Sequence, residues 1–138
     1  MDRSLVSKLN ISWPNVKYPN NIQFWDKQWR KHGSCSVHTF NQTEYFTQAD
    51  NLWNSHNITD ILITGGIKPN GSEYAYDTVE RPIQIATGKE PELRCAPSSL
   101  GRQLLHEVVL CYNHKGTTPI DCNPLHSTCD RNFQIKFI

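Results

Sequence analysis

The chain has 138 residues, of which 37% are hydrophobic and 20% are charged, and this length is enough for one domain with a buried core. Fourteen lysine and arginine residues against thirteen acidic residues give a formal net charge of +1, so charge alone does not indicate a nucleic-acid-binding protein. The sequence has no apolar run of about 18 residues, which argues against a membrane span, and it shows no charged-then-apolar leader at its N-terminus.

Helices are expected in the first two thirds of the chain. Residues 4–11 are predicted to finish a helix that begins earlier. Further helices are predicted over 21–32, 40–55, 60–64 and 78–87. Thr59 or Asp60 is expected to cap the third of these and Asp77 the fourth, because short polar side chains accept hydrogen bonds from exposed N–H groups. Glycines are expected to end three of the helices: Gly33, Gly65 with Gly66, and Gly88.

Strands are expected in the last third of the chain. They are predicted over 92–96, 105–112 and 132–138. Val108 and Val109 favour extended structure, and Phe133, Ile135 and Phe137 alternate with polar residues. Helices followed by strands predict an α+β fold in which helices flank an antiparallel sheet.

The helix predicted over 21–32 carries the most informative side chains. Five of its residues share one face, because they are spaced three or four positions apart: Phe24, Lys27, Gln28, Lys31 and His32. A ring, two cations, an amide and an imidazole make a poor core, but they suit a phosphodiester. The cations would hold the phosphate, the imidazole would move a proton, and the ring would stack on a base.

The segment 24–35 has the sequence Phe-Trp-Asp-Lys-Gln-Trp-Arg-Lys-His-Gly-Ser-Cys. It resembles the second active-site segment of the ribonuclease T2 family, whose pattern is Phe-Trp-x-His-Glu-Trp-x-Lys-His-Gly-Thr/Ser-Cys. The matching positions are Phe24, Trp25, Trp29, Lys31, His32, Gly33, Ser34 and Cys35. The chain departs from the pattern at Lys27, where the family has histidine, and at Gln28, where it has glutamate.

A glutamine at position 28 is similar to the plant self-incompatibility ribonucleases, the S-RNases, and the similarity covers nearly all of the chain. Four further segments agree with that subgroup: Ser12-Trp13-Pro14-Asn15-Val16, Gly66-Ile67-Lys68-Pro69, Leu93-Arg94-Cys95 and Glu107-Val108-Val109-Leu110-Cys111. The resemblance implies the family's α+β fold and a secreted, monomeric RNA endonuclease of the style that uses no cofactor or metal. It also implies RNA as substrate and recognition by pollen F-box proteins.

The resemblance also implies roles for the residues of the helix. His32 would act as general base, taking the proton of the ribose 2′-OH so that the oxygen attacks phosphorus and forms a 2′,3′-cyclic phosphate. Lys31 would offset the charge of the phosphorane, and Gln28 could donate a hydrogen bond but could not exchange a proton. Lys27 keeps a cation where the family has a histidine that contacts phosphate. The alternatives are a structural histidine at a helix end and solvated lysines.

Phe24, Asn15 and Val16 resemble the family's site for the base on the 3′ side of the cut, where stacking is worth about 1–3 kcal/mol per base. Trp25 and Trp29 fall on the other side of the helix and are predicted to be core. The remaining histidines are predicted to be structural or surface residues: His38, His56, His106, His114 and His126.

The family has an earlier active-site segment, His-Gly-Leu-Trp-Pro, which supplies a second catalytic histidine, and these 138 residues do not contain it. The chain therefore resembles the C-terminal two thirds of a family member and is interpreted as a fragment, with one partial domain over 1–138. Without an acid to protonate the leaving 5′-oxygen, weak or no activity is expected, since general acid–base catalysis contributes about 10²–10⁴-fold.

The chain has five cysteines, and an odd count in a chain with secreted features suggests a missing partner. The family resemblance implies two disulfides, Cys95–Cys129 and Cys111–Cys122. Cys35 would then pair with a cysteine upstream of the first residue. The alternative is a zinc site, which would use Cys122, His126 and Cys129 with His114 nearby.

Four Asn-x-Ser/Thr sites lie in polar segments and support secretion and glycosylation: Asn10, Asn41, Asn57 and Asn70. Two other functions stay open beside the style ribonuclease. The absent first segment and Gln28 would suit a secreted glycoprotein that binds RNA or a protein without cleaving RNA. The family also contains S-like ribonucleases for phosphate recycling or defence.

Overall fold

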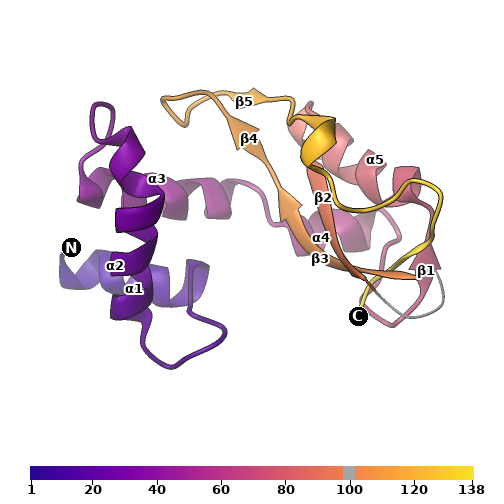
Figure 1. Cartoon of the computed structure of the whole chain (residues 1–138), viewed down its shortest axis with the longest axis horizontal. Coiled ribbons are helices and arrows are strands. Elements are labelled where there is room, and N and C mark those ends of the chain that lie inside the picture. Colours follow the sequence, from indigo (N-terminus) through magenta and orange to yellow (C-terminus); the bar gives the residue numbers. More distant parts are fainter. Residues whose placement is uncertain (98–101) are drawn as a thin grey trace. The chain divides into compact units, whose positions relative to one another are not determined.

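The computed structural model describes residues 1–97 and 102–138, and the chain divides into two units (Figure 1). The first unit comprises Met1–Ser55 with His114–Gly116, and the second comprises His56–Asn113 with Thr117–Ile138. In the described part, the first unit is helical and the second combines helices with two small sheets. No helix among the described residues is long and apolar enough to cross a membrane.

The first unit contains α1 (Arg3–Ser12), α2 (Asn21–Lys31), the 3-10 turn η1 (Gly33–Ser36) and α3 (Gln42–Ser55). Asp2 begins α1 by accepting a hydrogen bond from the N–H of Leu5 at 2.8 Å. Asn20 begins α2 in the same way, with the N–H of Gln23 at 2.9 Å. The helices predicted over 21–32 and 40–55 are therefore confirmed, with small shifts at their ends. The helix predicted over 4–11 is also present, but it begins at Arg3 after the cap Asp2, so these residues do not finish a longer helix.

The core of the first unit forms among its three α-helices. Its buried members are Leu5 and Leu9 of α1, Trp25 of α2 and Phe46 of α3. The indole N–H of Trp25 donates to the carbonyl oxygen of Trp13 at 2.8 Å, so this fully buried ring leaves no polar group without a partner. The prediction that Trp25 is a core residue is confirmed.

In the second unit, α4 (Ile58–Thr64) begins earlier than predicted. The side chain of Asn57 accepts a hydrogen bond from the N–H of Asp60 and donates one to the carboxylate of Asp60, at 3.3 and 2.7 Å. This reciprocal pair resembles a capping box and fixes the helix start at Asn57. The prediction that Thr59 or Asp60 caps this helix is therefore wrong.

The longer helix α5 (Tyr76–Thr87) has no side-chain cap at its N-terminus. Asp77, predicted as the cap, lies inside the first turn and forms an ion pair with Arg131 at 3.0 Å. Gly88 ends the helix in the left-handed region, with φ 69°, as predicted.

The main sheet of the second unit has the order β1-β6-β3-β2. Its strands are β1 (Glu73–Tyr74), β2 (Glu92–Pro97), β3 (Gln103–Val109) and β6 (Ile135–Lys136). β2 with β3 and β1 with β6 are antiparallel, whereas β3 and β6 are parallel, with Gln103 opposite Ile135. The α+β prediction is confirmed, and the sheet predicted as antiparallel is a mixed one.

A second, two-stranded sheet joins β4 (Cys111–Tyr112) to β5 (Pro119–Ile120), and the turn η3 (Pro124–His126) follows. Two disulfides lie in this unit, Cys95–Cys129 and Cys111–Cys122, which is the pairing implied by the family resemblance. The strand predicted over 105–112 is divided between β3 and β4, and the strand predicted over 132–138 is limited to β6.

Arg131 joins the C-terminal segment to α5. Its guanidinium lies 4.1 Å from the centre of the Tyr76 ring and contacts the carboxylates of Asp77 and Glu80 at 3.0 and 3.3 Å. Burial raises the pKa of Glu80 above its ordinary value, and the positive charge of Arg131 opposes this shift. These contacts stabilise the second unit around a partly desolvated acid.

Candidate functional site

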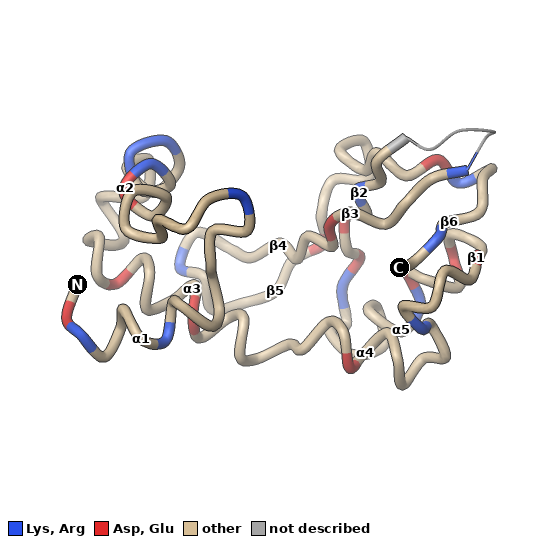
Figure 2. The backbone as a smooth tube through the Cα atoms, turned by 90° about the horizontal axis from the view of Figure 1, so that it is seen from below, with Lys and Arg blue, Asp and Glu red and all other residues tan. Residues whose placement is uncertain are grey.

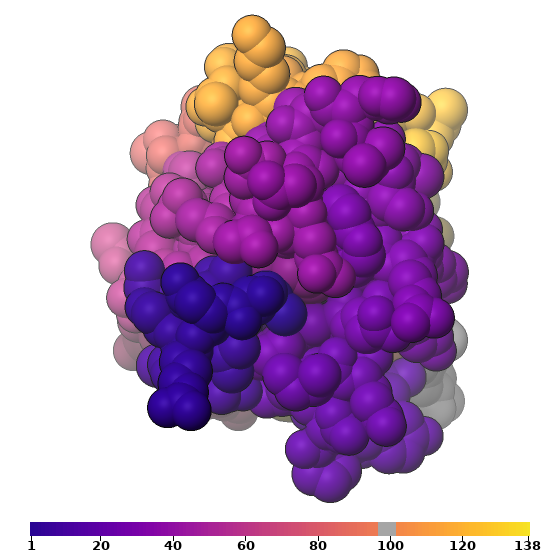
Figure 3. Space-filling model, turned by 90° about the vertical axis from the view of Figure 1, so that its left-hand side faces the viewer, coloured from indigo at the N-terminus to yellow at the C-terminus, as the bar shows by residue number. Residues whose placement is uncertain are grey.

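The first unit contains a cleft of about 630 Å³ between the loop that follows α1 and one side of α2. The loop contributes Trp13, Pro14, Asn15, Val16, Lys17, Tyr18 and Asn20, and α2 contributes Gln23, Phe24, Lys27 and Gln28. Figure 3 shows one face of this unit, with α1 in indigo and the segment around residues 20–40 in violet. The volume lies within the range of about 300–1,000 Å³ typical of ligand sites.

Hydrogen bonds inside the loop hold its shape. The Oδ1 atom of Asn15 accepts from the backbone N–H groups of Lys17 and Tyr18 at 3.1 and 3.3 Å. The N–H of Asn15 donates to Oδ1 of Asn21 at 2.7 Å, which connects the loop to the first residue of α2. Both lone pairs of the Asn15 oxygen are thus occupied, so Asn15 positions the loop and offers a ligand only its amide N–H.

Helical spacing places the predicted binding residues of α2 along the cleft. Phe24, Lys27 and Gln28 line it, and together with Asn15 and Val16 they account for five of the seven predicted catalytic and substrate-binding residues. Phe24 is half-buried and packs edge-on against Trp13, with ring centres 6.2 Å apart. The ring is therefore held in place while part of it stays open to the cleft.

The other two predicted residues, Lys31 and His32, lie at the C-terminal end of α2, outside the cleft lining, and both are exposed. Lys31 is the last residue of the helix. His32 is its C-cap, and its N–H donates to the carbonyl of Gln28 at 2.9 Å. The backbone of His32 is therefore hydrogen-bonded to Gln28, which lines the cleft.

Gly33 determines how the chain leaves α2. It is buried, and a Cβ atom at this position would overlap the ring of Trp29. The α-helix ends directly before Gly33, as predicted, but Gly33 is not among the glycines with a positive φ, so the close approach of Trp29 is what requires a glycine here. The residue is needed for the close approach of Trp29 to the backbone beside His32.

Aromatic packing supports the cleft from beneath. The ring of Tyr45 on α3 lies 5.5 Å from that of Trp29 and 5.3 Å from that of Phe46, measured between ring centres. Burial raises the pKa of the Tyr45 hydroxyl, so this group stays protonated at neutral pH. Tyr45 and Phe46 also pack against Trp13 of the cleft lining, with ring centres 6.2 and 5.6 Å apart, so the cluster supports the cleft.

Positive charge gathers beside α2, where Figure 2 shows lysine and arginine positions in blue. Arg30 is neutralised by Asp26 at 3.0 Å, one turn earlier on the helix. Among the described residues, Lys17, Lys27 and Lys31 form no ion pair. These three ammonium groups are available to an anion.

The residues predicted outside the cleft have other contacts. His56 lies 3.2 Å from the Tyr112 hydroxyl, and Cys35 is an exposed free thiol. Cys122 and Cys129 are bound in disulfides, so the alternative zinc site has lost its sulfur ligands. The four candidate glycosylation sites are all exposed: Asn10, Asn41, Asn57 and Asn70.

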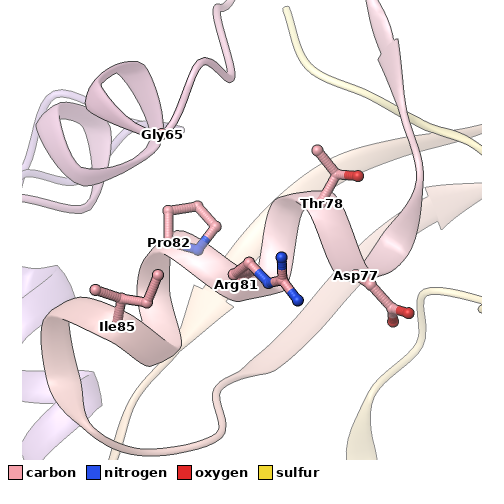
Figure 4. A pocket seen from close by; sticks show the side chains of 6 residues that line it. All are labelled: Gly65, Asp77, Thr78, Arg81, Pro82 and Ile85. Carbon is pink, nitrogen blue, oxygen red and sulfur yellow. The ribbon is translucent and has the colours of Figure 1, made fainter.

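A second hollow, of about 390 Å³, lies in the other unit between the end of α4 and α5 (Figure 4). Gly65, Thr78, Pro82 and Ile85 line it together with Asp77 and Arg81. Asp77 is already paired with Arg131, and neither α4 nor α5 contains a histidine, whereas the helix beside the first cleft is capped by His32. The first cleft is therefore the better candidate site.

Six residues of the cleft lining were not predicted as site residues: Trp13, Pro14, Lys17, Tyr18, Asn20 and Gln23. Lys17 and Tyr18 directly follow the predicted Asn15 and Val16, and Gln23 precedes Phe24. A loop between two prolines gives no periodic signal, so its side chains could be assigned to the cleft only once the turn at Asn15 was known.

A model of the ribonuclease T2 family matches residues 1–122. Ribonuclease MC of Momordica charantia is 39% identical over 130 residues, which cover 94% of this chain and 67% of that protein. Ribonuclease S-3 of Pyrus pyrifolia is 36% identical over 127 residues, which cover 88% of this chain and 56% of that protein. The solved structure of ribonuclease MC1 from bitter gourd seeds superposes with a TM-score of 0.89 at 37% identity, over 97% of this chain and 69% of that one.

The chain spans between 50% and 67% of the length of three of the curated relatives that it matches. Relatives from Solanum lycopersicum include one named as intracellular and one named as extracellular. A variant of ribonuclease MC1 has been solved in complex with 5′-UMP.

Proposed function

The chain belongs to the ribonuclease T2 family, and from this we propose that it binds RNA in the cleft beside α2 and cleaves it by transesterification. One observation carries the proposal. A half-buried ring, a cation without an ion pair among the described residues and an amide line one cleft, in the order Phe24, Lys27 and Gln28, and a second cation and an imidazole follow at the end of the same helix. Such a set can bind a base and a phosphate and accept a proton.

In the proposed reaction, neutral His32 takes the proton of a ribose 2′-OH while the 2′-oxygen forms a bond to the adjacent phosphorus. The bond from phosphorus to the 5′-oxygen breaks, and that oxygen takes a proton from water. The products are a 2′,3′-cyclic phosphate and a free 5′-hydroxyl, and later hydrolysis of the cyclic phosphate gives a 3′-phosphate. Lys31 and Lys27 offset the added negative charge, and Gln28 donates a hydrogen bond to a phosphoryl oxygen.

A polypeptide of these 138 residues is expected to be a slow catalyst. Water is a weaker acid than a positioned imidazolium, and general acid–base catalysis contributes about 10²–10⁴-fold to the rate. Gln28 adds no proton transfer of its own, because an amide does not ionise.

The biological setting is a further proposal, which rests on Gln28, the relatives and the features typical of secreted proteins. Gln28 and the similarity to ribonuclease S-3 favour a self-incompatibility ribonuclease recognised by pollen F-box proteins, whereas the similarity to ribonuclease MC favours an S-like ribonuclease. The two disulfides and the exposed Asn-x-Ser/Thr sites favour secretion as a glycoprotein. A non-catalytic RNA-binding glycoprotein is the second candidate, and Gln28, whose amide cannot exchange a proton, favours it.

The test is to incubate the purified protein with single-stranded RNA in EDTA beside two variants, His32→Ala and His38→Ala. His38 is also exposed, and it lies outside the cleft lining, so it is the matched control. We expect slow formation of cyclic-phosphate ends that disappears in His32→Ala and persists in His38→Ala. If RNA binds through Phe24 but no cleavage depends on His32, the protein binds RNA without cleaving it, and the second candidate function is correct.

A further inference from the structure

The helices α4 and α5 leave an open groove on the surface of the second unit. The hollow of about 390 Å³ shown in Figure 4 continues into another of about 430 Å³, because Gly65, Pro82 and Ile85 line both of them. The groove shares no lining residue with the cleft beside α2, so the reaction proposed above does not use it.

The two helices run in opposite directions along the groove. Gly65, which follows α4, lies beside Thr78 near the start of α5, whereas Asp60 near the start of α4 lies in the same hollow as Ala86. The α5 lining repeats every four residues, from Thr78 through Pro82 to Ala86, and a rise of 1.5 Å per residue makes this stripe about 12 Å long. An extended chain of about four residues has the same length.

The middle of the groove is apolar and exposed. Ile85 is 78% exposed and lies where the two hollows join, next to the ring of Pro82. Gly65 keeps the helices close together here, because a Cβ atom on it would lie 2.5 Å from Cβ of Pro82. An apolar side chain placed on this surface would cover Ile85 and the proline ring.

Each helix also offers the groove a backbone carbonyl that lacks its helical partner. Pro82 has no N–H, so the helical hydrogen bond to the carbonyl of Thr78 is missing. On the other side, the three N–H groups that follow α4 donate to other carbonyls, and no backbone N–H of the described residues donates to the carbonyl of Thr64. Two hydrogen-bond acceptors of groove-lining residues therefore remain for N–H groups from outside.

The charges at the two ends of the groove are opposite. Arg81 lies at one end and forms no ion pair among the described residues, while its neighbour Asp77 is already paired with Arg131. Asp60 lies at the other end, where its carboxylate accepts a hydrogen bond from Asn57 and pairs with no cation of the described part. A ligand that complements both ends carries an acid and a base about four residues apart.

We infer that the groove binds an extended segment of a partner protein, about four residues long. An acidic residue of the segment pairs with Arg81, apolar side chains cover Pro82 and Ile85, and a basic residue pairs with Asp60. Backbone N–H groups of the segment donate to the carbonyls that lack helical partners, as in other complexes in which an extended peptide is recognised through its main chain. This interaction is independent of the proposed RNA cleavage.

The test is to select a phage-displayed library of random hexapeptides on the wild-type protein and to measure the selected peptides by fluorescence anisotropy. We expect sequences with an acidic residue, apolar residues and then a basic residue, or the reverse order. Ile85→Asp is expected to weaken their binding by about 10-fold or more, because the apolar contact is lost. Selection on Arg81→Glu is expected to replace the acidic residue by a basic one, a change that a folding defect would not produce.

Matched controls in the same unit are Leu125→Asp, at an apolar residue that is 87% exposed, and Lys68→Glu, at an exposed lysine. Neither residue lines the groove, so both variants should bind the peptides like the wild type. Circular dichroism checks that every variant is folded.

Three results would overturn the inference. The first is that no peptide is selected, and the second is that the selected peptides bind folded Ile85→Asp as tightly as the wild type or keep their acidic residue on Arg81→Glu. The third is a dimer in analytical ultracentrifugation that Ile85→Asp dissociates, because a second copy of the chain then occupies the groove. RNA cleavage by Ile85→Asp is expected to equal that of the wild type in each case, so the proposed function is tested separately.

Discussion

Asn15→Ala tests whether the loop beside α2 is held by a single side chain. The substitution removes the Oδ1 atom that accepts from the N–H groups of Lys17 and Tyr18 at 3.1 and 3.3 Å. The matched variant is Asn15→Asp, which keeps an acceptor oxygen in the same place and preserves the turn. Because aspartate matches asparagine in size, retention of stability in Asn15→Asp together with its loss in Asn15→Ala would assign the effect to the side-chain group that carries the acceptor oxygen.

The magnitude follows from the two bonds. A protein hydrogen bond contributes about 0.5–1.5 kcal/mol net, and water can reach the exposed N–H groups of this loop, which puts each bond near the lower limit. We expect Asn15→Ala to lower the free energy of unfolding by about 1 kcal/mol, and Asn15→Asp by less than about 0.5 kcal/mol. RNA binding should weaken in Asn15→Ala, because the loop must then be ordered when the ligand binds.

Urea denaturation followed by circular dichroism measures the stability, and fluorescence anisotropy with a labelled 2′-O-methyl trinucleotide, which cannot be cleaved, measures the binding. Equal destabilisation by alanine and aspartate would show that the Oδ1 contacts do not hold the loop. A change in base preference in Asn15→Ala, with stability and total affinity unchanged, would show that the residue selects the base and has no positioning role.

Gly33→Ala should cost about 1–3 kcal/mol of unfolding free energy in the same urea assay, because the new Cβ overlaps Trp29; a stable variant with unchanged RNA cleavage would contradict that packing role. Arg131→Gln should destabilise more at pH 7 than at pH 4. Burial raises the pKa of Glu80, so the folded protein binds this proton more tightly than the unfolded chain, and stability falls as pH rises through the ordinary carboxyl range. Loss of the opposing Arg131 charge enlarges that fall. The double variant Glu80→Gln, Arg131→Gln should lose most of the pH dependence. Equal destabilisation by Arg131→Gln at pH 7 and pH 4 would contradict this role of Arg131.

The helical part of the fold could be predicted from the sequence because its signals are local. The polar caps and apolar spacing of α2 specify its ends within a residue, and Gly88 marks the end of α5 by the left-handed conformation that glycine adopts easily. The sheet could not be predicted to the same depth. Alternation around Ile135 indicates a strand, but it does not show that this strand pairs with β1 on one side and runs parallel to β3 on the other.

The candidate site could likewise be predicted only in part from the sequence. Helix spacing is sufficient to place Phe24, Lys27 and Gln28 on one side of α2, and the structure finds them in one cleft. The contributions of Lys17 and Tyr18 depend on a turn held by a side chain two or three residues earlier, and no periodic pattern encodes such a turn. The contact between Gly33 and Trp29 joins residues only four positions apart, but sequence spacing does not show that the ring leaves no room for a Cβ atom at Gly33.

The aromatic core and the disulfides fall in different units of the chain. All four tryptophans lie within Met1–Ser55, and both disulfides lie in the other unit. Intrinsic tryptophan emission therefore observes unfolding of the unit that contains the cleft beside α2, while a reducing agent acts on the disulfides of the unit that contains the sheets. The free thiol of Cys35 adds a single labelling position on the cleft side. The two units can therefore be followed separately, one by its tryptophan fluorescence and the other by reduction of its disulfides.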